Sequence, residues 1–138
     1  METQESALVC NYTAISANQR ENHLANATQI FKTVVEVKEL PTGCAFRLSN
    51  QDDQFLELAQ FINFERLCCP FYHFKLEVEP KNGDLWLSLE GGEGVKDMLA
   101  KVLGGYVKPE VLEKMFVGND IAMKQQFVQA TLNLPKII

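Results

Sequence analysis

The sequence predicts an α+β fold in two layers, in which helices cover one face of a four-stranded antiparallel sheet. One observation is that strand, glycine-containing turn, strand and helix follow one another twice, starting at VEVKELPTGCAFRLS and at LEVEPKNGDLWLSLE. The other is that apolar and polar residues alternate within both segments, which is typical of strands that bury one face. We therefore expect a core of two ββα units, preceded by one helix and followed by a helical tail.

The first unit follows an N-terminal helix. Ser16 and Gln19 match a capping box, so a helix is expected to begin after Ser16 and to run to about Ile30. Residues 33–40 and 44–49 alternate as two strands around the turn PTG, which predicts a hairpin. The residues expected to face the core are Thr33, Val35, Val37, Cys44, Phe46 and Leu48.

Residues 50–68 give the clearest helical pattern in the chain. Asn50 or Asp52 is expected to cap this helix, and its expected apolar stripe is Phe55, Leu58, Ala59 and Ile62. Pro70 should end it at about Cys68, because a proline disfavours the helical conformation of the preceding residue. On a helical wheel Cys69 continues the apolar stripe toward the core, whereas Cys68 lies beside Glu65 at the rim.

The second unit repeats the arrangement of the first. Residues 72–79 and 85–90 alternate on either side of the turn PKNGD, and a short helix is expected from Glu93 to Leu103. The residues expected to face inward are Tyr72, Phe74, Leu76, Val78, Leu85, Leu87 and Leu89. These elements complete a single domain over residues 1–105.

Residues 106–138 are expected to form a helical extension. Pro109 suits the first position of a short helix, and a second helix is expected from about Asn119. The second helix carries two apolar stripes, which indicates two packing partners. We therefore expect the extension to pack on its own domain or on a second subunit, which would give a homodimer.

Composition and charge exclude several classes of partner. The chain has 138 residues and a formal net charge of −5, so it lacks the basic surface needed to bind nucleic acids or anionic membranes. No apolar run reaches the roughly 18 residues of a membrane span, and the N-terminal residues do not match a signal peptide. We therefore expect a cytoplasmic protein. Its four cysteines are expected to be thiols, because disulfides are rare in a reducing compartment.

The polar face of the predicted sheet is a candidate binding surface. Arg47, His73 and Trp86 alternate away from the core, and an exposed tryptophan is the unusual member of this group. The three residues are therefore candidates for contact with a partner or ligand.

The adjacent cysteines in FERLCCPF are the main functional signal. They lie at the negative end of a helix dipole, where a thiolate is disfavoured by roughly 0.3–1 kcal/mol and a bound cation is favoured by a similar amount. The knuckles of structural zinc sites need cysteines two to four positions apart, so adjacent thiols do not match them. A disulfide between Cys68 and Cys69 would close a strained ring. A soft cation bound by thiolates fits these constraints, since thiolates select soft ions.

The candidate metal ligands are Cys10, Cys68 and Cys69, with Glu65 as an oxygen ligand. Cys10 lies in the N-terminal lead, which can fold back over the helix end, whereas Cys44 shares the apolar side of its strand and is expected to be a core residue. The candidate ions are zinc, cadmium, mercury and arsenite. Simple burial of the central pair is an equally open alternative, because unpaired cysteine is among the most buried residue types.

The motif around the cysteines resembles the marker E-R-x-C-C-P-F of a family of small bacterial proteins with no established activity. The matching residues are Glu65, Arg66, Cys68, Cys69, Pro70 and Phe71, followed by LWLSLEGGEGVKDML, with Cys10 and Arg20 also in the pattern. The resemblance covers about residues 8–103. It implies importance for the cysteine cluster without naming a reaction.

Three classes of function are open at this point. The first is a thiolate site that binds or senses a soft metal or metalloid ion. The second is a non-catalytic interaction or dimerisation module whose cysteines serve packing. The third is a thiol-dependent enzyme with Cys68 as an exposed sulfur, which requires a Cys68 pKa well below the free value of about 8.5.

Overall fold

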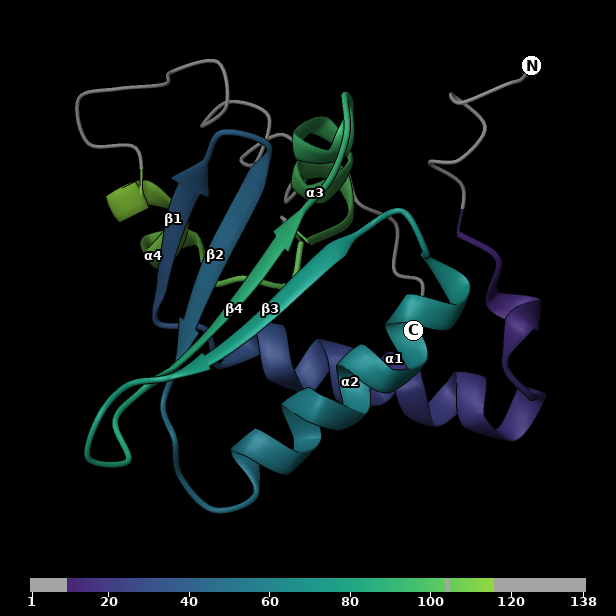
Figure 1. The fold of residues 1–138 in the computed structure, drawn as a ribbon, viewed down its shortest axis with the longest axis horizontal. Helices are drawn as coiled ribbons and strands as arrows, with labels where there is room; N and C mark the ends of the chain where they lie inside the picture. Colours follow the sequence, from purple (N-terminus) through teal and green to yellow (C-terminus); the bar gives the residue numbers. More distant parts are fainter. Residues whose placement is uncertain (1–9, 104, 116–138) are drawn as a thin grey trace.

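The computed structural model describes residues 10–103 and 105–115. Figure 1 shows the described elements, in which helices pack against a single sheet. In chain order these are the 3-10 helix η2 (Tyr12–Ala14), α1 (Ala17–Lys32), β1 (Glu36–Leu40), β2 (Gly43–Leu48), α2 (Gln54–Cys68), β3 (His73–Val78), β4 (Leu85–Glu90), α3 (Val95–Leu103) and α4 (Pro109–Met115).

The strands form one antiparallel sheet in the order β1-β2-β4-β3. Each predicted hairpin is a pair of neighbouring strands, and β2 and β4 join the two hairpins at the centre of the sheet. The predicted α+β class, with four antiparallel strands and helices, is therefore confirmed (Figure 1).

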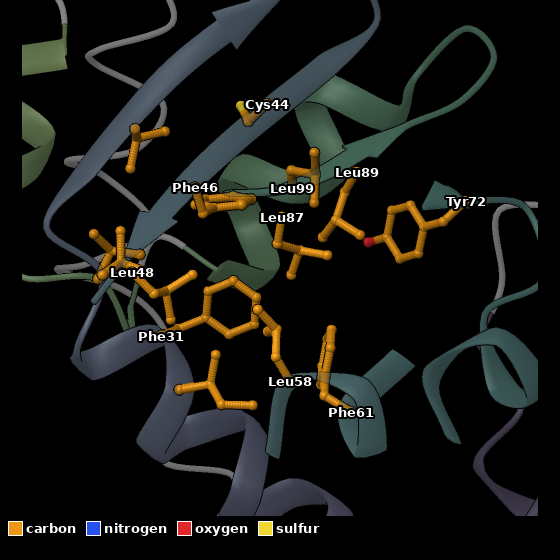
Figure 2. Close-up of a cluster of buried hydrophobic side chains, with 14 of the residues drawn as sticks. Phe31, Cys44, Phe46, Leu48, Leu58, Phe61, Tyr72, Leu87, Leu89 and Leu99 are labelled. Atoms are coloured by element: carbon orange, nitrogen blue, oxygen red, sulfur yellow. The ribbon is translucent and has the colours of Figure 1, made fainter. Parts of the chain in front are cut away.

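One face of the sheet forms the hydrophobic core together with the helices. On the central strands Phe46 pairs with Leu87 and Leu48 with Leu85, so these four side chains share a face, and all are buried. Figure 2 shows this cluster, in which the ring of Phe31 meets that of Phe46 edge to face at 5.2 Å. The helices contribute Ile30 and Phe31 from α1, Leu58 and Phe61 from α2, and Val95, Leu99 and Ala100 from α3.

Two valines predicted to face inward are exposed instead. Val35 precedes β1, which begins at Glu36, and the buried residue of this segment is Val34. Val78 is the last residue of the edge strand β3 and is exposed. Alternation predicts the side of a strand that a residue occupies, but it does not predict where the strand starts or how far the helices cover it.

The predicted N-cap of α1 is confirmed. Ser16 is the N-cap residue, and its hydroxyl accepts a hydrogen bond from the backbone N–H of Gln19 (3.4 Å). This bond satisfies one of the backbone donors that the first turn of a helix leaves unpaired.

The start and the buried side of α2 differ from the prediction. The N-cap is Asp53, rather than Asn50 or Asp52, and its side chain makes no capping hydrogen bond. Phe55 is exposed, because α2 packs against α1 as well as the sheet and this contact turns a neighbouring stripe inward. The buried residues of α2 are Leu58, Phe61, Glu65 and Cys68.

The beginning of the C-terminal extension packs on the sheet. α4 starts at Pro109, as predicted, and contacts β1. Val107, Val111 and Leu112 are buried in the same core as the strands. The second expected helix, from about Asn119, lies outside the described residues, so the homodimer through the C-terminal helices stays a prediction.

The opposite face of the sheet is polar. The register aligns Glu36 with Arg47, Arg47 with Trp86, and Trp86 with Glu77 across the four strands.

Among the residues that the structure describes, no helix is long and apolar enough to cross a membrane.

Candidate functional site

Three potential metal ligands meet where the end of α2 packs against α1. His23 comes from α1, and Glu65 and Cys68 come from the last turns of α2. One ligand atom from each residue lies within 4.8 Å of the others. The nitrogen, oxygen and sulfur donors therefore converge on a single point.

The helical periodicity of the two segments explains this convergence. Phe61, Glu65 and Cys68 are separated by four and three residues, so they share the side of α2 that faces α1. On α1, His23 precedes the buried Ile30 by seven residues and lies on the same buried side. Each helix thus carries its polar ligands within a stripe that is otherwise apolar.

His23 and Glu65 form a buried pair. The Nε2 atom of His23 lies 2.7 Å from Oε1 of Glu65, and the side chains are 1% and 12% exposed. When the carboxylate is ionised it only accepts hydrogen bonds, and Nε2 is then the donor in this pair. The imidazole also stacks on Phe61, with ring centroids 5.5 Å apart.

The second ring nitrogen of His23 has no partner in the described part of the chain. Nδ1 is buried and makes no hydrogen bond there, which is uncommon for a buried polar atom. The ring borders a groove of about 350 Å³ between α1 and α2, which is also lined by Asn22, Asn26, Leu56 and Phe64. One edge of the imidazole therefore faces the Glu65–Cys68 cluster, and the residue also contributes to the groove wall.

Cys68 is fully buried, which corrects the expectation that it lies at an exposed rim. Its Sγ lies 3.8 Å from Oε1 of Glu65 and 3.7 Å from the backbone oxygen of the same residue. Burial first, and the neighbouring Glu65 carboxylate second, raise the pKa of Cys68 to about 12. Near neutral pH this sulfur is therefore a protonated thiol that donates to Glu65.

The expectation that all four cysteines are thiols is wrong. Cys10 and Cys69 form a disulfide, and only Cys44 and Cys68 are free. The N-terminal lead folds back over the end of α2 until the Cα atoms of Cys10 and Cys69 are 4.5 Å apart, which is within disulfide range. The fold-back of Cys10 over the helix end was expected from the sequence, but the bond between these two residues, which are separated by 59 in sequence, was not. The cytoplasmic location, from which reduced cysteines were expected, stays a prediction.

Backbone contacts hold the lead and the helix end together. The N–H of Asn11 donates to the carbonyl oxygen of Cys68 at 2.6 Å, and the N–H of Cys69 donates to that of Glu65 at 2.7 Å. Two of the carbonyls that a helix end leaves unpaired are thereby satisfied. Cys69 is fully buried, and its Sγ lies 3.9 Å from Sγ of Cys68.

Of the four predicted ligands, Glu65 and Cys68 belong to this cluster. Cys69 lies beside Cys68 and is joined to Cys10 by the disulfide. Sequence reasoning missed His23. The missed signal is the helical spacing of His23, which lies seven positions before Ile30 and eight before Phe31. This spacing places the imidazole ring on the buried side of α1. The apolar neighbour of His23, Leu24, is only partly buried, although hydrophobicity alone would favour Leu24 for the core.

The predicted surface residues lie on the opposite face of the sheet. Trp86 is covered by Lys38, whose Nζ is 4.6 Å from the ring centroid, and its Nε1–H donates to Glu79 at 2.8 Å. Arg47 pairs with Trp86 in the register and binds Glu36 and Asp84. His73 pairs with Glu90, four positions along β4 from Trp86, so it is not grouped with the other two.

Comparison of the chain with protein-family models, with curated proteins and with solved structures finds no match in any of the three. The resemblance to the E-R-x-C-C-P-F family therefore stays a prediction. The candidate site is defined by its geometry, namely vicinal cysteines beside a His–Glu–Cys cluster that could hold a metal ion.

Proposed function

We propose that this protein binds a divalent metal ion of the zinc class through His23, Glu65 and Cys68. The observation that carries the proposal is the convergence of three buried side-chain donors within 4.8 Å of one another. Their number and proximity match the three protein ligands of many zinc sites that keep an open position.

The charge of the cluster favours a divalent cation. An ionised Glu65 would contribute one negative charge, and Cys68 would contribute a second when the metal displaces its thiol proton to solvent, so a divalent ion would make the site neutral. The negative end of the α2 dipole acts in the same direction. A buried carboxylate beside a helix C-terminus is otherwise costly, and its hydrogen bond with His23 offsets only part of that cost.

The donor types narrow the choice among the candidate ions. Zinc accepts imidazole nitrogen, carboxylate oxygen and thiolate sulfur, whereas the most thiophilic ions select sulfur-rich sites. A mixed set of one nitrogen, one oxygen and one sulfur therefore supports zinc or a similar ion over mercury or arsenite.

The sulfur–oxygen distance is close to that of a tetrahedral site, whereas the nitrogen–oxygen distance would have to lengthen. Zinc–ligand bond lengths imply a sulfur–oxygen separation of about 3.6 Å and a nitrogen–oxygen separation of about 3.3 Å across the metal. Cys68 Sγ and Glu65 Oε1 are 3.8 Å apart, and the 2.7 Å His23–Glu65 hydrogen bond would open as the metal replaces its proton. The proton displaced from Nε2 would pass to Nδ1 of the same ring, which has no hydrogen-bond partner in the described residues.

The competing functions have less support. A thiol enzyme that attacks through Cys68 needs a lowered pKa and access to substrate, and this thiol is buried with a raised pKa. A purely structural cluster would explain the burial, but it leaves Nδ1 of His23 without a partner in the described residues. A dimerisation module remains compatible with metal binding, because the residues predicted to mediate it lie elsewhere.

Isothermal titration of zinc into chelator-treated protein tests the proposal. We expect one ion per chain with a Kd below about 1 μM, and a loss of at least about tenfold in affinity for His23→Gln, Glu65→Gln and Cys68→Ser. Cys44→Ser is the matched control, since Cys44 is the other buried free thiol and lies on β2, outside the cluster. If neither the oxidised nor the reduced protein binds zinc tighter than this limit, or if the three variants bind like Cys44→Ser, the proposal is wrong.

A further inference from the structure

We infer that Cys69 is a fourth ligand of the same metal, and that the Cys10–Cys69 disulfide controls it. With the disulfide closed, three donors face the ion; with it reduced, a second thiolate joins them. This inference rests on the proposed metal site and adds its regulation by thiol redox state.

The position of the Cys69 sulfur supports this role. It lies 3.9 Å from Sγ of Cys68, and two thiolates on one tetrahedral zinc are separated by about 3.8 Å. Cys69 is buried at the same helix end, where its N–H is bound to the carbonyl of Glu65. Its sulfur therefore needs almost no displacement to share an ion with Cys68.

A disulfide and a metal compete for this sulfur. Thiolates, not disulfides, are the sulfur ligands of zinc, so Cys69 is a poor donor while it is bonded to Cys10. Reduction yields the thiols of Cys10 and Cys69, and zinc would displace the proton from the Cys69 thiol. The oxidised and four-ligand states therefore exclude each other.

The reductive step requires a dithiol reductant. One of its thiolates attacks Sγ of Cys10, which is partly exposed, and Cys69 leaves as the thiolate. The second thiol of the reductant then attacks the mixed disulfide, forms a cyclic disulfide and releases Cys10. The protein disulfide gains two electrons and two protons, and the reductant loses the same number.

Linkage makes the control reciprocal. If reduction raises the affinity for the metal, then the metal favours the reduced form by the same factor. Metal would thus make the disulfide easier to reduce, and oxidation would release the metal. The proposed site would then report both metal supply and thiol redox state.

Cobalt binding followed by absorption spectroscopy tests this inference, because sulfur-to-cobalt charge-transfer bands grow with the number of thiolate ligands. Wild-type protein and the control Cys44→Ser are each measured in the oxidised and the reduced state. Cys69→Ser is measured reduced. Cys10→Ser, which cannot form the disulfide, is measured without reductant. All samples are handled anaerobically. Reduced wild type should give about twice the charge-transfer intensity of the oxidised protein, and an affinity at least about tenfold higher.

The variants separate the role of Cys69 from other effects of reduction. Cys10→Ser without reductant should match reduced wild type, and reduced Cys69→Ser should match the oxidised protein. Cys44→Ser should behave as wild type in both states. The comparison of the two wild-type states needs no variant, so it still tests whether reduction adds a sulfur ligand where Cys69→Ser fails to fold, and Cys10→Ser then assigns that sulfur to Cys69 if the added intensity remains.

The outcomes distinguish the two proposals. Equal affinity and equal band intensity in oxidised and reduced wild type would overturn the role of Cys69 and leave the three-ligand site standing. Absence of cobalt binding in both states would overturn both. A reduced Cys69→Ser protein that keeps the full intensity would assign the added sulfur to Cys10 and refute the inference.

Discussion

At the scale of residues, burial separates the two free cysteines from ordinary reactive thiols. Cys44 lies on β2 within the core cluster of Figure 2, and Cys68 lies beside a buried carboxylate. Burial raises the pKa of both, because a thiolate loses hydration when it is enclosed by apolar groups. The difference between them is their neighbours, since only Cys68 lies within a set of other metal ligands.

The Cys44 thiol predicts a loss of stability at alkaline pH. Burial, which is the largest cause, raises its pKa from 9.0 to about 12. Lys96 lowers this pKa by a smaller amount, and Glu39 raises it. Between these values the unfolded chain binds fewer protons than the folded one, so the free energy of unfolding falls as pH rises. This thiol contributes a slope of up to about 1.4 kcal/mol per pH unit between pH 9 and pH 12, and none well below pH 9.

Urea denaturation of wild type and Cys44→Ala across this pH range checks the prediction. Lysines and tyrosines also titrate there, so the relevant quantity is the difference between the two proteins. The stability gap should be constant below pH 9 and should shift in favour of the variant above it. A gap that does not change with pH would contradict the assigned pKa.

At the scale of elements, the sequence predicts the secondary structure better than the faces of the helices. Strand alternation has a period of two, so it identified the buried Phe46, Leu48 and Leu87 correctly. In a helix, two neighbouring stripes can be similarly apolar, so the pattern does not decide which of them faces the core. For this reason Phe55 was expected to be buried but is exposed, and Cys68 was expected at the rim but is buried. The fold-back of the lead over the end of α2 was expected, but the sequence does not show which of the adjacent cysteines Cys10 would bond, because that choice is a tertiary contact with no local signal.

The hairpin between β1 and β2 predicts a strong requirement for glycine at Gly43. A Cβ atom at this position would collide with the backbone of Leu89 and Glu90 on β4, and sheet backbone cannot move aside as a flexible side chain can. We expect Gly43→Ala to destabilise the protein by about 2–3 kcal/mol. Gly92→Ala is the matched control, since a Cβ there meets nothing within 4 Å.

Thermal or urea denaturation of the two alanine variants measures this difference. Gly92→Ala should lie within about 0.5 kcal/mol of wild type. If Gly43→Ala were equally well tolerated, the close approach of β2 to β4 at this point would be wrong.

At the scale of the whole molecule, one covalent bond joins the N-terminal lead to the centre of the chain. The Cys10–Cys69 disulfide closes a loop that contains α1, the first hairpin and α2 (Figure 1). Cross-linking restricts the unfolded chain, and the effect grows with the length of the closed loop. Half of the fold is therefore stabilised by a bond that depends on redox conditions.

This loop predicts a redox-dependent stability. For a sequence separation of 59 between the cysteines, the loop-entropy relation gives about 4 kcal/mol of stabilisation for the oxidised protein. Cys10→Ser should lose about this amount without reductant and should match reduced wild type when reductant is present. Urea denaturation in a metal-free buffer with chelator measures both conditions. Equal stability of wild type and Cys10→Ser under oxidising conditions would rule out a contribution from the bond.

The distribution of sulfur in the fold has a practical consequence for chemical labelling. Two cysteines are bonded to each other, and the other two are enclosed by the core, so the folded protein presents no accessible thiol. A thiol-specific reagent added to the native oxidised protein should therefore count almost none of its four cysteines. Unfolding should reveal two and reduction the remaining two. Such counts would report how far the fold and its disulfide have opened in any preparation.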